Sequence, residues 1–322
     1  MAKPKVAFYW NASCGGCEEA VVDLAEDILT VVDAVEFVLW PVAMDFKRED
    51  VEALDDGEIA VAFLNGSVRT SEQEDWARLL RRKAGLVVAF GSCAHLGGIP
   101  GLANFSNREG VFEASYGYLP SVDNPEGVVP QTETKVKEGT LELPEIYDTV
   151  YALDQVVDVD YYLPGCAPPA DLILDAVNAI LSGELPPKGT VLAPTKSLCD
   201  ECDRNESKPD KIEISELKRP HQTMIDPEKC FLAEGIICMG PATRAGCGER
   251  CINANMPCRG CFGPTDEVRD QSAKFLSALA SVLDVDEPEE MERLSESIPD
   301  VTGLFAMYSL PVTLLKRRKL EK

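Results

Sequence analysis

The twelve cysteines of the chain fall into two groups whose spacing suits metal chemistry. Four are spread through the first half, and these are Cys14, Cys17, Cys93 and Cys166. The other eight are crowded between residues 199 and 261, and these are Cys199, Cys202, Cys230, Cys238, Cys247, Cys251, Cys258 and Cys261. Since one cubane iron–sulfur cluster takes four cysteine thiolates, twelve cysteines match three such clusters.

Each cysteine of the first half follows one of three predicted buried strands, which are Val6–Trp10, Leu86–Phe90 and Val156–Leu163. The carboxyl ends of parallel strands share one edge of a sheet, so the four thiols are expected to converge on one point. Two alternatives remain open. Cys14-Gly15-Gly16-Cys17 also fits a thioredoxin-like redox pair, and Cys93 and Cys166 also fit small core residues. The pattern favours a four-cysteine cluster, because a dithiol enzyme needs only two of these thiols.

The later eight cysteines predict two further four-cysteine sites. The expected sets are Cys199, Cys202, Cys230 and Cys238, and Cys247, Cys251, Cys258 and Cys261. Zinc is the alternative metal, because pairs of cysteines two residues apart also build zinc ribbons. Iron–sulfur is favoured, since three sites in one chain make sense as an electron relay, whereas two structural zinc ions beside a cluster have no evident purpose.

Strands and helices alternate through the first half, which predicts an α/β fold with a doubly wound parallel sheet. Two more strands are expected at Val35–Trp40 and Ile59–Leu64. The expected helices are Glu18–Leu29, Ser71–Lys83 and Ala170–Leu181. The stretch 97–150 is rich in turn residues, so we expect a long excursion that covers a partner surface or a site.

A linker at Pro186–Gly189 divides the chain into two predicted domains, 1–185 and 186–322. The second domain is expected to be smaller and irregular up to Pro264, with one clear helix at Asp266–Leu283. Its cysteine-rich part buries too little apolar surface to fold alone, so we expect metal to stabilise it.

Composition narrows the classes of function further. The net charge of −24 disfavours nucleic-acid binding. No apolar run reaches the 18 residues of a membrane span, and the start of the sequence has no export signal, so we expect a cytoplasmic protein. A reducing cytoplasm favours metal or catalytic roles for the cysteines over disulfides. No phosphate-binding glycine motif follows the first strand. His95 and His221 are expected to be polar neighbours, not ligands, and the basic segment 316–319 to be solvated.

Together these residues resemble the small, electron-transferring subunit of NiFe hydrogenases, over essentially the whole chain. The resemblance rests on the C-x-x-C motif after the first strand, on Gly91–Ala94, on Pro164–Pro168 and on the C-terminal cysteine series. It implies a flavodoxin-like domain followed by an iron–sulfur domain, with no catalytic residue in this chain. It also implies that the first four cysteines hold a proximal cluster facing a NiFe centre on a separate large subunit.

Two departures from exported family members indicate the type. Cys199 stands where those members carry a histidine ligand, and Cys251 adds a fourth ligand to the medial cluster. The motifs Cys238–Thr243 and Pro257–Cys261 resemble the cytoplasmic methyl-viologen-reducing type. That resemblance implies a medial cluster on Cys247, Cys251, Cys258 and Cys261 and a distal cluster on Cys199, Cys202, Cys230 and Cys238.

The same type implies partners and a reaction. The expected partners are a NiFe-bearing large subunit, a small iron–sulfur subunit and a heterodisulfide reductase-like complex, working together in flavin-based electron bifurcation. Three alternatives stay open. The acceptor could be a deazaflavin, the large subunit could lack NiFe, or the chain could be a thiol oxidoreductase with zinc modules.

Overall fold

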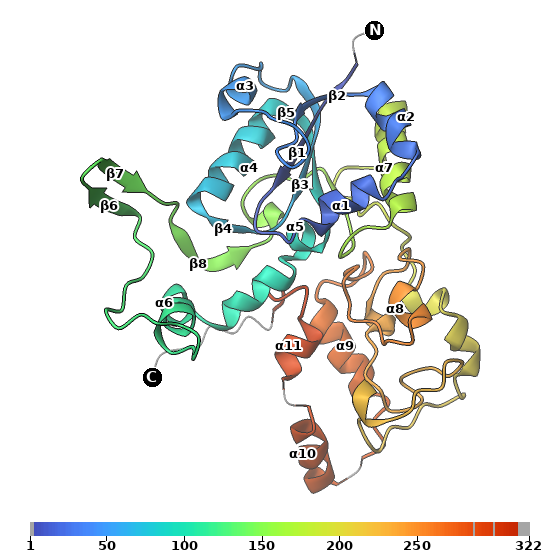
Figure 1. The fold of residues 1–322 in the computed structure, drawn as a ribbon. Helices are drawn as coiled ribbons and strands as arrows, with labels where there is room; N and C mark the ends of the chain where they lie inside the picture. Colours follow the sequence, from blue (N-terminus) through green and yellow to red (C-terminus); the bar gives the residue numbers. More distant parts are fainter. Residues whose placement is uncertain (1–2, 286, 299, 315–322) are drawn as a thin grey trace.

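The computed structural model describes residues 3–285, 287–298 and 300–314, and the basic segment 316–319 lies outside the described residues. Its centre is a five-stranded parallel sheet in the order β2-β1-β3-β5-β9 (Figure 1). The strands are β1 (Lys5–Trp10), β2 (Glu36–Leu39), β3 (Ile59–Asn65), β5 (Ala84–Phe90) and β9 (Tyr161–Leu163). Numbered within this sheet, the order is 2-1-3-4-5, the flavodoxin-like order. The predicted doubly wound α/β fold is confirmed.

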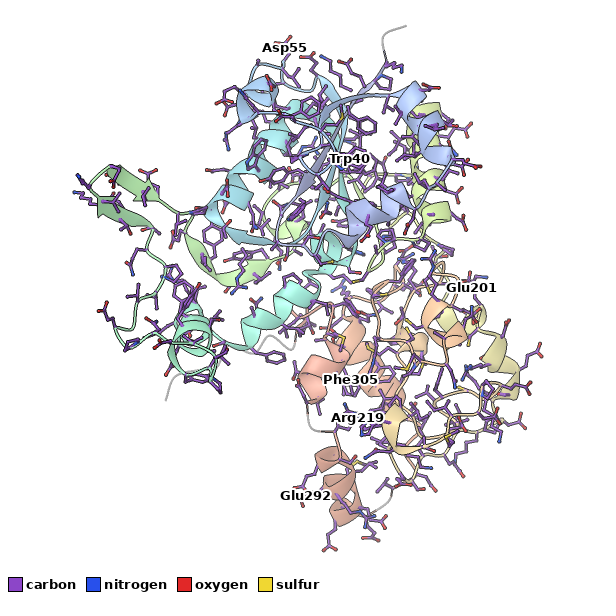
Figure 2. The ribbon with its side chains drawn as sticks, viewed as in Figure 1. Trp40, Asp55, Glu201, Arg219, Glu292 and Phe305 are labelled. Atoms are coloured by element: carbon purple, nitrogen blue, oxygen red, sulfur yellow. The ribbon has the colours of Figure 1, made fainter. Side chains whose placement is uncertain are left out.

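Helices cover both faces of the sheet, each over its own apolar core. One face packs against α1 (Gly16–Val22), α2 (Asp27–Ala34) and α7 (Ala170–Ser182). The other packs against α3 (Arg48–Glu52), α4 (Ser71–Lys83) and α5 (Ser92–Leu96). Trp40, labelled in Figure 2, is 5% exposed and stacks on Phe8 in the first of these cores. Coverage on both faces explains why β3 and β5 are nearly continuous apolar runs.

The predicted single helix Glu18–Leu29 is wrong, because the structure has α1 and α2 in its place. Ala25 between them has a left-handed φ of 52°, which no helix interior allows. Val31 of α2 and Val35, which follows it, join the core under the sheet. The break therefore lets the chain turn from the end of β1 towards the start of β2.

Two other predicted elements are shorter in the structure. Residues 156–160 of the predicted strand Val156–Leu163 instead follow the short helix η3 (Leu153–Gln155), and Val157 packs in the core beside α4. The predicted helix Asp266–Leu283 begins only at Gln271, as α9 (Gln271–Ala280). The Asp270 carboxylate accepts a hydrogen bond from the Ala273 amide at 2.9 Å, so this side chain caps the helix and fixes its start.

The excursion 97–150 has structure of its own. Its elements are η1 (Ile99–Phe105), α6 (Arg108–Phe112), η2 (Glu113–Gly117), β6 (Glu133–Val136), β7 (Gly139–Glu142) and β8 (Ile146–Tyr151), and β8 pairs with β4 (Val68–Thr70). The Asn104 side chain exchanges two hydrogen bonds with the Val150 backbone, at 2.9 and 2.7 Å, and so fastens η1 to β8. The β6–β7 hairpin projects from the body of the protein (Figure 1).

The second half has few regular elements and a separate apolar core. Its helices are η4 (Leu198–Asp200), η5 (Asp203–Ser207), η6 (Pro220–Gln222), η7 (Gly240–Ala242), α8 (Arg250–Asn253), α9, α10 (Pro288–Glu296) and α11 (Val301–Phe305). Phe305, labelled in Figure 2, packs against Phe275 of α9 with the two rings tilted and their centroids 5.0 Å apart. Cys230, Cys238 and Cys258 belong to this core. Among the described residues no helix is long and apolar enough to cross a membrane.

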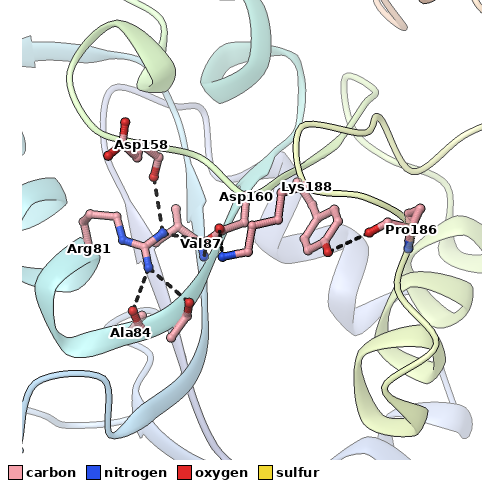
Figure 3. Close-up of polar contacts among 9 residues, drawn as sticks. Arg81, Ala84, Val87, Asp158, Asp160, Pro186 and Lys188 are labelled. Atoms are coloured by element: carbon pink, nitrogen blue, oxygen red, sulfur yellow. Dashed lines mark hydrogen bonds and ion pairs between the residues drawn. The ribbon is translucent and has the colours of Figure 1, made fainter.

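One buried carboxylate fastens the linker to the sheet (Figure 3). Asp160, 6% exposed, precedes β9 and accepts hydrogen bonds from the Arg81 guanidinium, the Lys188 ammonium and the Val87 amide, at 2.6, 2.6 and 2.8 Å. Burial alone would raise the pKa of the Asp160 carboxyl, but hydrogen bonds from Lys188, Arg81 and Val87 hold it below its ordinary value. The backbone of Asp160 also accepts from Gly189, at 2.7 Å.

We predict that Asp160→Asn lowers the free energy of unfolding by about 2 kcal/mol at pH 7, since hydrogen bonds to a charged group are removed. The depressed pKa means that this stability is present above about pH 4 and is lost as the pH falls through the lower, folded-state value. Urea unfolding followed by circular dichroism, at pH 7 and below pH 4, measures both effects.

Lys188→Ala is the matched control, because the Lys188 side chain is 64% exposed and an exposed ion pair contributes about 1 kcal/mol or less. Equal stabilities of Asp160→Asn and the unchanged protein at pH 7 would contradict the role given to the Asp160 carboxylate.

Candidate iron–sulfur centres

The structure places the first four cysteines at one edge of the parallel sheet. Cys14 and Cys17 follow β1, Cys93 lies in α5 directly after β5, and Cys166 follows β9. Cys17 and Cys93 are buried, whereas Cys14 and Cys166 are exposed. We call these four residues the proximal set. Burial is the main cause that raises the pKa of the Cys17 thiol, and Cys93, Cys166 and Cys14 each add to the rise. The four thiols therefore lie within electrostatic reach of one another.

Gly91 leaves room for the sulfur of Cys17. The residue has a left-handed φ of 84°, and a Cβ atom built on it would collide with Cys17 Sγ. Its amide donates to the Leu163 carbonyl at 2.8 Å, which joins the ends of β5 and β9. The glycine thus allows two strand ends to close around a thiol that any larger residue would displace.

A buried polar group lies beside the proximal set, and sequence reasoning did not single it out. Asn65, at the end of β3, donates from Nδ2 to Glu18 Oε1 at 3.1 Å. Glu18 Oε2 and both side-chain polar atoms of Asn11 have no hydrogen-bond partner within the described part of the chain. Burial raises the pKa of the Glu18 carboxyl. An acid directly after Cys17 was the available signal, and the unsatisfied atoms sit at the β1–β3 switch point where flavodoxin-like folds bind ligands.

Four of the later cysteines line one cavity, and we call them the distal set. They are Cys199, Cys202, Cys230 and Cys238. Gly240 lies against this cavity, where a Cβ atom would come within 3.0 Å of Cys199 Sγ. Arg204, 6% exposed, supports the wall: its guanidinium lies 4.2 Å from the Phe231 ring centroid and donates to the carbonyls of Asp226 and Lys229, just before Cys230. The donor set fits a metal group held by four thiolates.

The remaining four cysteines, the medial set, are Cys247, Cys251, Cys258 and Cys261. Cys258 is buried and Cys251 is exposed. Burial raises the pKa of Cys261 to about 12, and Cys166 of the proximal set together with Cys247 and Cys251 contributes to the rise. Burial likewise raises the pKa of Cys258 to about 12, with contributions from Cys261 and Cys247. These four thiols therefore form one electrostatic group.

The medial set touches the other two. After burial, Cys166 of the proximal set is the largest cause that raises the pKa of the Cys261 thiol. Ser92 Oγ also donates to the carbonyl of Cys261. On the far side, the amide of Cys258 donates to Cys238 Sγ of the distal set at 3.3 Å. The order in space is proximal, medial, distal.

The cysteines are too far apart for single ions. In residues 3–285, 287–298 and 300–314, no three cysteine, histidine or carboxylate side chains could hold one metal ion. The twelve cysteines are all free of disulfide bonds. His95 packs 4.8 Å from the Tyr162 ring, and burial together with Arg244 lowers its pKa to about 3. His221 lies exposed in η6.

Comparison with known proteins agrees with this architecture. Residues 14–180 match the sequence family described as NADH ubiquinone oxidoreductase, 20 Kd subunit. The chain is 40% identical to the iron–sulfur subunit of the F420-non-reducing hydrogenase of Archaeoglobus profundus, over 98% of both chains. It is 35% identical to a subunit of the F420-non-reducing hydrogenase of Methanothermobacter thermautotrophicus, over 97% of this chain and 96% of the relative.

Among solved structures, the NiFeSe hydrogenase of Desulfovibrio vulgaris Hildenborough aligns with a TM-score of 0.52 and 18% identity, over 82% of this chain and 94% of that one. This likeness supports the fold. The sequence relatives and the family match identify the chain as a member of the NiFe hydrogenase small-subunit family, related to the corresponding subunits of F420-non-reducing hydrogenases.

Proposed function

We propose that this hydrogenase subunit relays electrons from hydrogen oxidation on a NiFe-bearing large subunit through three 4Fe-4S clusters. Cys14, Cys17, Cys93 and Cys166 hold the proximal cluster, the medial set holds the next, and the distal set holds the last. The electrons pass to a small iron–sulfur subunit and a heterodisulfide reductase-like complex that carries out flavin-based bifurcation.

The observation that carries this proposal is the pair of hydrogen bonds that join successive sets. The hydroxyl of Ser92, which directly precedes Cys93, donates to the carbonyl of Cys261, and the Cys258 amide donates to Cys238 Sγ at 3.3 Å. Each bond joins one proposed ligand, or its direct neighbour, to a proposed ligand in the next set. Three cysteine groups arranged in series suit an electron relay, whereas metal sites that only stabilise a fold do not have to lie next to one another.

The chain itself holds the metal groups and keeps them from water. Burial raises the pKa of Cys93, Cys199 and Cys238 to about 12, so these thiols keep their protons until metal binds and displaces them. A bound cluster supplies one-electron redox chemistry. All-cysteine ligation favours a low potential, which suits a low-potential acceptor.

The alternative interpretations have less support. A single zinc ion would bring its thiolates to within about 4 Å of one another, as Zn–S bonds of about 2.3 Å require, and the described residues offer no such group. A thioredoxin-like pair uses only two thiols, whereas Cys93 and Cys166 lie at the same edge of the sheet as Cys14 and Cys17. The relatives are named as hydrogenases that do not reduce F420, a deazaflavin, which supports the first proposal over the deazaflavin alternative.

The proposal also covers the domain boundary, the cellular location and the large subunit. We place the domain boundary between residues 185 and 186, at the start of the Pro186–Gly189 linker; Leu192 beyond it still packs against the first core, and the third core begins at Leu198. We place the protein in the cytoplasm, where a reducing environment keeps twelve cysteines free for metal. A large subunit that holds NiFe is recognised by two C-x-x-C pairs in its own sequence, and a large subunit without NiFe lacks them.

The anaerobically purified protein is predicted to contain about twelve irons per chain, with matching acid-labile sulfide, because each cubane holds four irons. Elemental analysis measures iron and zinc in the same sample. Zinc in place of iron would refute the cluster assignment, and about eight irons would mean that one set is wrongly assigned.

The double variant Cys199→Ser and Cys202→Ser is predicted to lose the distal cluster alone. Its iron content falls to about eight per chain, while the EPR signals of the proximal and medial clusters remain. Cys14→Ser with Cys17→Ser is the matched pair, which removes the proximal signal instead. An unchanged iron content in the first variant would contradict the distal grouping.

A further inference from the structure

A lysine lies beside the sulfurs of the distal set. Lys208 follows η5, is half-buried, and lines the cavity that Cys199, Cys202, Cys230 and Cys238 share. Burial is the main influence on the pKa of the Cys199 thiol, and the positive charge of Lys208 acts against it. The ammonium also donates to Asn205 Oδ1. A positive charge is therefore held next to the sulfur of Cys199.

A glutamate lies between the distal and medial sets. Glu249 lies two residues after Cys247 and two residues before Cys251, both of the medial set. Glu249 Oε2 accepts from the amide of Asp203 at 3.2 Å, which fixes the carboxylate beside the start of η5, directly after the distal residue Cys202. Burial is the main cause that raises the pKa of the Cys202 thiol, and the negative charge of Glu249 adds to the rise. One residue is thus close to both sets, and it places a negative charge beside the distal one.

The backbone of Glu249 is strained in order to reach this position. Its φ of 53° is left-handed, and Gly248 directly before it also has a positive φ, of 63°. Glycine adopts this conformation freely, whereas a residue with a Cβ atom does so at a cost in free energy. A glutamate at a position that suits glycine indicates a functional role, because backbone strain is found most often at functional sites.

We propose that Glu249 and Lys208 form a charge pair across the distal cluster that sets its reduction potential, Lys208 raising it and Glu249 lowering it. The proposal rests on the proposed function, since it takes the distal and medial sets as cluster ligands. Both are positioning residues: they act on the cluster through their charges and supply no ligand to it.

The signs follow from electrostatics. Reduction adds one electron, and hence one negative charge, to the cluster. A nearby ammonium stabilises that charge, and a nearby carboxylate opposes it. Because Lys208 lines the distal cavity and the negative charge of Glu249 acts on Cys202, the two charges oppose each other at the distal cluster. Both side chains are half-buried, so salt screens their charges incompletely.

The test is a dithionite titration of the anaerobically purified hydrogenase complex, followed by EPR of the distal cluster. At a fixed ambient potential, Lys208→Gln lowers the ratio of reduced to oxidised distal cluster about tenfold, equivalent to about 59 mV for one electron. Glu249→Gln raises the ratio by a similar factor, and the double variant returns close to the unchanged protein. Glutamine keeps an oxygen that accepts from the Asp203 amide, so Glu249→Gln changes charge and little else.

The controls separate charge from structure. Lys208→Arg keeps the positive charge and is expected to leave the potential unchanged. Lys211→Gln removes a lysine three residues away that is exposed and paired with Glu213, and its effect is expected to stay below twofold. Shifts of the same sign in Lys208→Gln and Glu249→Gln, or shifts no larger than that of Lys211→Gln, overturn the charge pair.

Loss of the distal EPR signal in Lys208→Gln, with normal potential in Lys208→Arg, also overturns it, because the residue then acts by holding the cluster in place. Iron content tells failure of the pair from failure of the proposed function. Variants that retain about twelve irons per chain but show no shift leave the relay intact and remove only the charge pair. Absence of the distal signal in the unchanged complex would instead contradict the relay itself.

Discussion

The burial of free thiols, which form no disulfide bonds, is the constraint on which the rest of the structure depends. Cys230, Cys238 and Cys258 are part of the apolar core of the second half, and burial raises the pKa of Cys238 and Cys258 to about 12. A buried thiolate is costly unless a metal shares its charge. Three of the proposed metal ligands are therefore also core residues, which explains how a segment with few regular elements can be compact.

The parallel sheet and the irregular half contribute differently to the relay. The sheet supplies rigidity, because three strand ends converge on the proximal set and Gly91 lets them approach Cys17. The second half is held to it by polar contacts. Ser92 donates to the carbonyl of Cys261, the Gly98 amide donates to the carbonyl of Tyr308 at 2.9 Å, and the Gln155 side chain donates to the carbonyl of Pro311 at 3.1 Å. These contacts place the medial set against the proximal set without a continuous sheet or helix between them.

The sequence predicted the sheet well, because strand ends followed by cysteines and a capped helix at Ser71–Lys83 are local signals. It failed where a tertiary contact overrides a local pattern. Ala25 breaks an apolar helical run, and Val157 joins the core from a turn instead of a strand. The buried group of Glu18 and Asn65 joins residues 47 positions apart, so no local spacing reveals it. The carboxylate of Glu249 beside Cys202 was hidden for the same reason.

The most direct test of three clusters in series is anomalous X-ray scattering at the iron edge from crystals of the anaerobically purified complex. We expect three separate groups of iron in this chain, the first beside Cys17, the second beside Cys258 and the third beside Cys238. The second group is expected to lie between the other two. Fewer than three groups, a different order, or scattering at the zinc edge from the second half would contradict it.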